Sequence, residues 1–326
     1  MSAPEIIVVG GGVAGLSCAS ELARAGRKVA VWSAAPPEQT TSMVAAAFWY
    51  PYRAEPIERV GPWAAVGYER FASIAADLRV GPVAGVIMRE AIEIFVEPQP
   101  DPPWSRYVDM FRHAMPDELP PGYGHGIVFE SPVIEMSRYL PWLVTQLDQL
   151  GVEIIERRLD SLAPALAVAR VVVNASGLGA RELVDDPRVY PVRGQIVRRE
   201  RQAIERVIID EHSRGGISYI IPRAHDVVLG GVADEHDVDL RERPEQTAAI
   251  VERCTRLDPA LAATALLEVK VGLRPCRDAV RLEAEEHGDS LLIHNYGHGG
   301  SGVTLSWGCA EDVCKRALAW LNIESR

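Results

Sequence analysis

Cysteine is scarce in this chain of 326 residues, and its pattern does not suggest a disulfide framework or a metal site. There are five cysteines, an odd number, and no CxxC motif occurs. We therefore predict no metal ion and expect reduced cysteines, as in a cytoplasmic protein. The cysteines are Cys18, Cys254, Cys276, Cys309 and Cys314.

Long apolar runs and an excess of positive charge are also missing. No stretch reaches the roughly 18 apolar residues of a membrane span, and the N-terminus lacks the basic and apolar regions of a signal peptide. The C-terminal Glu324-Ser325-Arg326 is not the Ser-Lys-Leu peroxisomal address. The net charge of −11 argues against nucleic acid as a partner. We expect a cytoplasmic protein without nucleic-acid or membrane partners.

Length and composition predict two cooperating domains. The chain exceeds what one compact core usually holds, and its 48% hydrophobic and 24% charged residues are ordinary for a globular protein. The order of predicted elements indicates an α/β fold with a discontinuous Rossmann-like nucleotide-binding domain and a substrate domain with a mainly antiparallel sheet. We expect residues 1–50, 133–190 and 266–326 in the first domain, and 51–132 and 191–265 in the second.

The first 32 residues form a strand, glycine turn, helix and strand pattern. Two short apolar runs, at 6–9 and 29–32, flank a segment with helical spacing. Between them, residues 10–15 read Gly-Gly-Gly-Val-Ala-Gly and satisfy G-x-G-x-x-G. Its glycines permit a tight turn, close approach of a pyrophosphate and close packing of helix on strand. The helix N-terminus then offers N–H groups to the phosphates.

This motif alone does not distinguish NAD from FAD. An acidic residue is expected about 20 residues further on to bind the ribose hydroxyls, but the second strand ends in Trp32-Ser33-Ala34. Ser33 or the backbone must take that role. Two other segments favour FAD: a strand at 171–173 that runs into small residues, and a turn at 297–302 with four glycines before a helix. Such costly flexibility indicates close approach of a flat cofactor.

The rest of the chain is less regular. Residues 51–130 are dense in prolines and aromatics and favour short strands and loops over a second βαβ unit. Alternating runs between 190 and 232 indicate an antiparallel sheet. Further helices are predicted at 137–150, 244–256 and 304–321, and further strands at 152–155 and 291–294.

Taken together, these segments resemble the D-amino acid oxidase family almost from end to end. Members carry non-covalent FAD and oxidise D-amino acids to imino acids, with dioxygen reduced to hydrogen peroxide. The imino acid then hydrolyses to a 2-oxo acid and ammonia. The resemblance implies FAD, a D-amino acid and dioxygen as cofactor and substrates, and a possible homodimer. It rests on the segments 41–52, 191–195, 219–222, 271–275 and 294–300.

The resemblance also implies roles for individual residues. Arg274 would bind the substrate carboxylate, since a guanidinium offers two parallel donors. Tyr219 would add a hydroxyl, the Gly300 carbonyl would accept from the amine, and Tyr50 and Tyr52 would line the substrate pocket. Hydride transfer needs only positioning, so no acid or base is assigned and His298 is expected to be structural. The expected FAD contacts are Gly10, Gly12, Val13, Ala14, Gly15, Ser33, Thr41, Ser42, Ala46, Ala47, Ser176, Gly177, Gly299, Gly302, Val303 and Thr304.

The sequence departs from the family pattern in places. Ala47 stands where glycine is usual, Ser301 where an aromatic can occur, and Tyr50 where glutamine is common. The segment before Tyr219 is short, which predicts a shortened lid and faster product release.

Several alternatives remain open. D-aspartate oxidase shares fold and chemistry but needs a second cation. Tyr52 stands where that subfamily has histidine, which favours neutral or apolar substrates, although Arg53, Arg214 and Arg223 could serve as that cation. Glycine or sarcosine oxidase chemistry fits less well. An NAD-dependent dehydrogenase, or a nucleotide-binding regulator without chemistry, would need no flavin.

Overall fold

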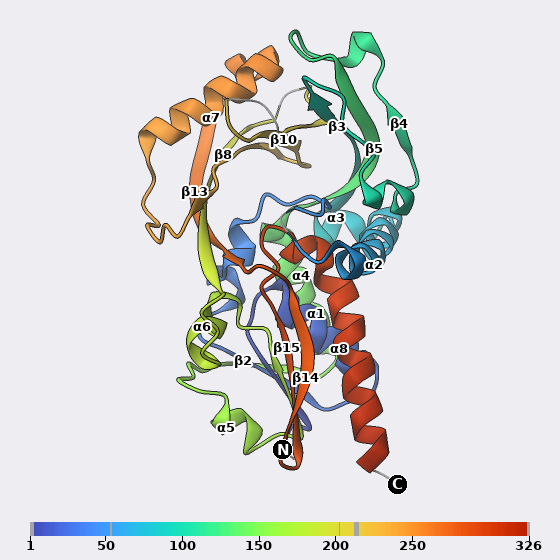
Figure 1. The fold of residues 1–326 in the computed structure, drawn as a ribbon, viewed down its shortest axis with the longest axis vertical. Helices are drawn as coiled ribbons and strands as arrows, with labels where there is room; N and C mark the ends of the chain where they lie inside the picture. Colours follow the sequence, from blue (N-terminus) through green and yellow to red (C-terminus); the bar gives the residue numbers. More distant parts are fainter. Residues whose placement is uncertain (1–2, 53, 202, 212–214, 325–326) are drawn as a thin grey trace.

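The computed structural model describes residues 3–52, 54–201, 203–211 and 215–324. It contains two sheets, one in the lower and one in the upper part of the view in Figure 1. The long helix α8 (Gly302–Glu324) begins between the two parts and runs down one side of the lower one.

The lower sheet has the strand order β14-β15-β7-β1-β2-β6. Neighbouring strands in it are parallel, except that β14 pairs with β15 as an antiparallel hairpin. Val9 on the central strand β1 is in register with Trp32 on one side and Asn174 on the other. This arrangement confirms the predicted Rossmann-like part. The strands are β1 (Ile6–Val9), β2 (Val29–Ser33), β6 (Glu153–Glu156), β7 (Val171–Asn174), β14 (Arg281–His287) and β15 (Ser290–Tyr296).

Both faces of this sheet are buried, which explains why β1 is apolar at every position. Ile6 and Val8 belong to the large core that includes α1 and α8, while Ile7 and Val9 belong to a smaller core on the other face. Helix α1 (Val13–Arg24) packs against both α8 and α4 (Met136–Gln149). The short helices α5 (Ala163–Leu166) and α6 (Ala180–Leu183) contribute to the smaller core and its edge.

The upper sheet has the order β12-β8-β11-β10-β9-β3-β5-β4. Strand β13 is not part of this order and also pairs with β8, along nearly its whole length. Among the described residues, the pairing of β3 with β9 is the one parallel pairing in this sheet, so the sheet is mainly antiparallel, as predicted. Helix α7 (Pro244–Leu257) packs against it. The strands are β3 (Val86–Phe95), β4 (Phe111–His113), β5 (His125–Ile134), β8 (Tyr190–Glu200), β9 (Val207–Asp210), β10 (Ser218–Pro222), β11 (Asp226–Gly230), β12 (Asp234–Glu235) and β13 (Leu266–Cys276).

The structure differs from the sequence-based expectation in two segments. Residues 51–130 were expected to hold only short strands and loops, but α2 (Ile57–Ala76) has 20 residues and is followed by the short α3 (Gly81–Ala84) and two ten-residue strands. Buried residues at helical spacing, such as Val60, Ala64 and Phe71, hold α2 on the core despite Pro62. Residues 266–276 were expected in the nucleotide-binding part, but β13 pairs with β8.

Helix α2 crosses α8 at two glycines. A Cβ on Gly67 would lie 2.0 Å from the Thr304 carbonyl oxygen, and a Cβ on Gly308 would lie 2.2 Å from the Trp63 carbonyl oxygen. The two backbones therefore touch, which only glycine permits. This contact fixes the start of α8, the element that reaches the site described next.

Candidate functional site

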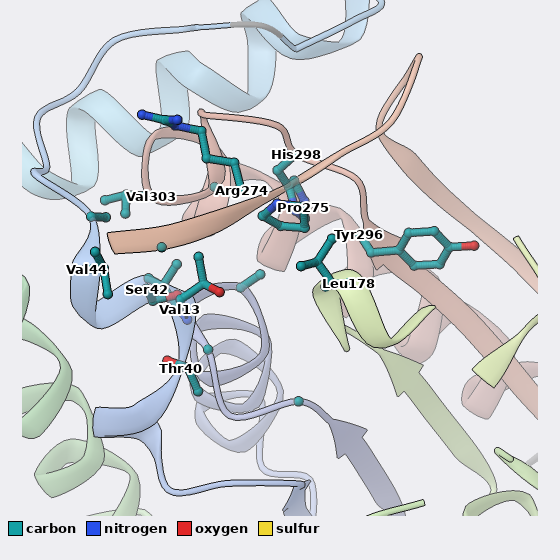
Figure 2. A pocket seen from close by; sticks show the side chains of 18 of the residues that line it. Val13, Thr40, Ser42, Val44, Leu178, Arg274, Pro275, Tyr296, His298 and Val303 are labelled. Atoms are coloured by element: carbon teal, nitrogen blue, oxygen red, sulfur yellow. Dashed lines mark hydrogen bonds between the residues drawn. The ribbon is translucent and has the colours of Figure 1, made fainter. Parts of the chain in front are cut away.

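A cavity of about 530 Å³ lies between the two sheets, a size typical of small-molecule sites. It is lined by the turn before α1, residues 39–52, the end of β7, strands of the upper sheet and the turn before α8. In Figure 2, Arg274 lies above Val303, and Val13 and Ser42 lie below them. Every residue predicted to contact substrate or cofactor lines this cavity, except Gly15.

Gly15 instead allows the turn to form. A Cβ there would lie 2.0 Å from the Gly10 carbonyl oxygen. Gly10 has a φ of 125°, which favours glycine, and lies against the Ala175 carbonyl. Gly15 was expected to contact FAD, but it does not line the cavity; it lets the helix pack closely onto the strand.

The first turn of α1 faces the cavity. Its N-cap is Gly12, which has no side chain to cap the helix, and the Val13 N–H donates to Ser42 Oγ at 3.0 Å. Ser42 belongs to a 3-10 turn, Thr41–Val44, that lies beside the start of α1. Donors at a helix N-terminus, small residues and a hydroxyl wall suit the pyrophosphate of a dinucleotide.

Two hydroxyls join the start of α8 to residues 50–52. Ser301 Oγ accepts from the Tyr52 N–H at 2.6 Å and donates to the Tyr52 carbonyl at 2.7 Å. Thr304 Oγ1 makes the same pair of contacts with Tyr50, both at 3.1 Å. Serine at position 301, a departure from the family pattern, thus has a structural role. Gly300 is required beside it, because a Cβ there would lie 2.4 Å from Tyr52 Cδ1.

The guanidinium of Arg274 lies at the cavity. Its Nη1 donates to the Val232 carbonyl at 2.9 Å, and no carboxylate within the described ranges forms an ion pair with it. It lies against Gly194 of the neighbouring strand, where a Cβ would be 2.5 Å from Nη1. A half-buried guanidinium that backbone carbonyls of Val232 and Arg193 hold in place is suited to bind a carboxylate.

Tyr219 lies beside Arg274. Its ring rests on Gly230 and Gly231, where added Cβ atoms would lie 2.0 Å from Cζ and 2.7 Å from Cε1. Burial raises the pKa of Tyr219, while the Arg274 guanidinium, within hydrogen-bonding reach of the hydroxyl, lowers it. The hydroxyl therefore stays protonated near neutral pH and can donate.

His298 is buried, with 4% of its surface exposed. Its Nε2 lies 3.0 Å from Asn295 Oδ1, and Asn295 Nδ2 donates to Cys18 Sγ at 3.1 Å. Since the amide oxygen of Asn295 is the acceptor, Nε2 of His298 carries the proton. Burial lowers the pKa of His298 to about 4, so the ring is neutral near pH 7.

Aromatic and aliphatic side chains form one wall of the cavity near Tyr219. Phe48 stacks on Tyr50 with ring centroids 5.5 Å apart, and the Tyr50 hydroxyl donates to Glu93 Oε1 at 2.9 Å. Burial and the charge of Glu93 raise the pKa of Tyr50. Sequence reasoning missed several lining residues, among them Phe48, Arg157, Arg158, Gly194, Ile209, Glu211 and Ile221.

The three arginines considered as second cations have different outcomes. Arg223 is buried and forms an ion pair with Asp226, with 2.6 Å between Nε and Oδ1, which argues against a role as the second cation. Arg53 and Arg214 lie outside the described residues. The expected short lid lies between β9 and β10, and positions 212–214 within it are also outside them.

The residues present fit FAD. A Cβ on Gly10, Gly11, Gly297 or Gly300 would lie 2.3–2.8 Å from a neighbouring atom, so these turns require glycine there, and the helix start at 302–304 also lines the cavity. Within the part of the chain that the structure describes, no group of three or more His, Cys, Asp or Glu residues could hold a metal ion, and no helix is long and apolar enough to cross a membrane.

Comparison with known proteins agrees with this site. Residues 5–316 match the DAO family, described as FAD dependent oxidoreductase. A D-amino-acid oxidase of Rubrobacter xylanophilus is 48% identical over 97% of this chain and 96% of its own length. A human D-aspartate oxidase is 34% identical over 97% and 95%. A glycine oxidase structure from Geobacillus kaustophilus covers 97% and 95% with a TM-score of 0.79 and 17% identity, so it shares the fold.

The cofactor is therefore FAD, and the alternatives of an NAD-dependent dehydrogenase and of a regulator without chemistry are set aside. The match spans both sheets and every lining segment of the cavity. The chain belongs to the family of FAD-dependent oxidoreductases that the DAO model describes.

Proposed function

We propose that the protein oxidises D-amino acids with FAD and dioxygen and prefers neutral or apolar side chains. The names of its relatives support the first part, since those at 48%, 41% and 39% identity are D-amino-acid oxidases. The observation that carries the proposal is the Arg274 guanidinium at the cavity, anchored by the Val232 carbonyl and beside the Tyr219 hydroxyl.

These groups would fix the substrate at three points. Arg274 and Tyr219 would bind the carboxylate, and the Gly300 carbonyl would accept from the amine. With the carboxylate and the amine fixed, only one enantiomer directs its Cα hydrogen towards the cofactor, because in the mirror image the side chain and the hydrogen exchange places. Tyr52, whose ring lies against Gly300, would limit movement of the amine.

FAD, when bound, would supply the acceptor for the hydride from Cα and the route for two electrons to dioxygen, which gives hydrogen peroxide. No described side chain needs to take a proton from Cα, and His298 is assigned a structural role. The substrate must enter with a neutral amine, so its ammonium proton leaves to solvent. The imino acid product then takes up water and yields a 2-oxo acid and ammonia.

The residues that would hold FAD come from several segments that line the same cavity. We keep for them the roles implied by the sequence, except that Gly15 packs the helix onto the strand. The division into FAD-binding and substrate-binding domains, the homodimer and the cytoplasmic location remain predictions. The proposed FAD contacts that line the cavity are Gly10, Gly12, Val13, Ala14, Ser33, Thr41, Ser42, Ala46, Ala47, Ser176, Gly177, Gly299, Gly302, Val303 and Thr304.

The preference for neutral or apolar substrates rests on the wall near Tyr219. Phe48 and Tyr50 present their rings, and the Tyr50 hydroxyl is engaged by Glu93. Glu211 also lines this region and contributes to raising the pKa of Tyr219, so a second carboxylate in the substrate would meet negative charge. Arg223 is paired with Asp226 and is therefore not placed to bind a second substrate carboxylate.

The test is a comparison of initial rates of oxygen consumption with D-alanine, D-valine and D-aspartate, with L-alanine as the control for chirality. We expect kcat/KM to be higher for D-alanine or D-valine than for D-aspartate, and no turnover of L-alanine. Dominant turnover of D-aspartate would overturn the substrate preference, and turnover of none of the D-amino acids by FAD-loaded protein would overturn the proposed activity.

A further inference from the structure

The ends of two neighbouring strands reach the cavity side by side. Strands β2 and β6 are parallel, with Ser33 in register with Glu156. Residues 34–35 after β2 and residues 157–159 after β6 therefore leave the sheet at the same edge. Both segments line the cavity. In a dinucleotide-binding fold, the end of the second strand is where a carboxylate binds the adenosine ribose.

This chain has no carboxylate at that place. Ser33 stands there, and its hydroxyl donates to the Ala35 carbonyl at 2.6 Å while its side chain packs against Gly11. Glu156 faces a separate, neighbouring cavity that it lines together with Glu38. The carboxylates that line the main cavity within the described ranges are Glu182 on α6 and Glu211 beyond β9, and neither lies on β2 or β6.

Two arginines occupy the place instead. The Arg157 guanidinium lies over the Trp32 ring, 4.0 Å from its centroid, and the Arg157 N–H donates to the Ser33 carbonyl at 2.7 Å. Arg158 follows and also lines the cavity. Neither arginine forms an ion pair with any residue that the structure describes. The cation–π contact holds the guanidinium of Arg157 flat while its N–H groups stay at the rim.

We propose that Trp32, Ser33, Arg157 and Arg158 form an adenosine site of inverted charge, here called the arginine shelf. Where a carboxylate accepts from ribose hydroxyls, a guanidinium donates, and donors prefer an anion. The arginine shelf holds the adenosine ribose of FAD. In FAD-free protein it binds adenosine nucleotides with a phosphate on the ribose more tightly than nucleotides without one, as an arginine does for a 2′-phosphate in other dinucleotide sites.

The inference concerns the cofactor end of the cavity, so it does not depend on which D-amino acid is the substrate. The experiment uses protein from which FAD has been removed and which regains its flavin spectrum when FAD is added back. Adenosine 2′,5′-bisphosphate and 5′-ADP are titrated by calorimetry, because both carry two phosphates. FAD affinity is measured separately by quenching of flavin fluorescence.

We expect the bisphosphate to bind about tenfold more tightly than 5′-ADP, the effect of one charge-assisted contact. In R157A this preference for the bisphosphate should disappear, and FAD should bind several-fold more weakly than to the wild type. The FAD affinity of R157K should lie between those of the wild type and R157A. The matched control is R170A, because Arg170 lies over Trp320, 5.6 Å from the centroid, and does not line the cavity. R170A should keep both affinities.

Three results would overturn the arginine shelf. The first is equal affinity of the wild type for the two nucleotides. The second is an R157A variant that binds FAD and both nucleotides as R170A does. The third is a loss of FAD affinity in E182Q but not in R157A, which would place the ribose contact on the Glu182 carboxylate.

Discussion

The guanidinium of Arg274 lies against Gly194, two residues along β8 from Val192, the residue paired with Arg274. A Cβ at position 194 would be 2.5 Å from Nη1 and 2.8 Å from Cζ. Because Gly194 has no side chain, the guanidinium of Arg274, which we propose binds the substrate carboxylate, has room beside it. This relationship was not predicted, because it depends on the register between two strands about 80 residues apart.

Replacing Gly194 with alanine should displace Arg274 without removing it. We expect KM for D-alanine to rise at least about tenfold, equivalent to about 1.4 kcal/mol, while FAD remains bound. Steady-state oxygen consumption gives KM, and the flavin spectrum gives occupancy. The control is G124A, where a Cβ would meet Val96 at an ordinary 3.5 Å. An unchanged KM in G194A would mean that Arg274 does not bind substrate in the position seen here.

The crossing of α2 and α8 should tolerate no side chain at Gly308. An alanine there gains up to about 1 kcal/mol of helix propensity, but its Cβ would collide with backbone of Trp63. Overpacking costs typically 1–3 kcal/mol, so we expect a net loss of about 1–2 kcal/mol in the free energy of unfolding. Urea unfolding measures it. K315A, on an exposed part of the same helix, should be near neutral; a G308A as stable as K315A would contradict the close crossing.

His298 should make the protein less stable in mild acid. Its pKa is about 4 in the folded protein and about 6.5 when unfolded, so between these values the unfolded chain binds more protons. The stabilisation is complete above pH 6.5 and is lost as pH falls towards 4. A shift of about 2.5 units corresponds to about 3 kcal/mol.

The measurement is urea unfolding of wild type and H298Q from pH 7 to 4 with saturating FAD. The wild type should lose more free energy of unfolding than H298Q over this range, since the other titrating groups are common to both proteins. Parallel pH dependences would show that His298 is not buried as a neutral ring.

Local patterns predicted the lower sheet well. The strand, turn and helix from Ile6 to Arg24 follow from short-range spacing and from glycines whose roles are local, and the structure keeps them almost unchanged. The G-x-G-x-x-G turn needed no information from the rest of the chain. Residues of the cavity were found for the same reason, since each lies in a short segment that resembles the family.

Long-range contacts account for what sequence reasoning missed. Helix α2 was overlooked because nearby prolines suggested loops, although buried Val60, Ala64 and Phe71 repeat at helical spacing. The membership of β13 in the upper sheet depends on its pairing with β8, which no local signal shows. The engagement of Arg223 by Asp226 did have a local signal, three residues away, that could have excluded it as a second cation.

The role of Arg274 as the carboxylate ligand can be measured by anaerobic reduction of bound FAD with D-alanine in wild type and R274A. Loss of a buried charge partner typically costs 2–5 kcal/mol, so R274A should keep its flavin spectrum but need at least about 30-fold more D-alanine for half reduction. R274K should fall between them, since one ammonium cannot match a carboxylate with two donors. L-alanine should leave the flavin oxidised in all three proteins. Half reduction of R274A at the wild-type concentration of D-alanine would contradict the role of Arg274 as the carboxylate ligand.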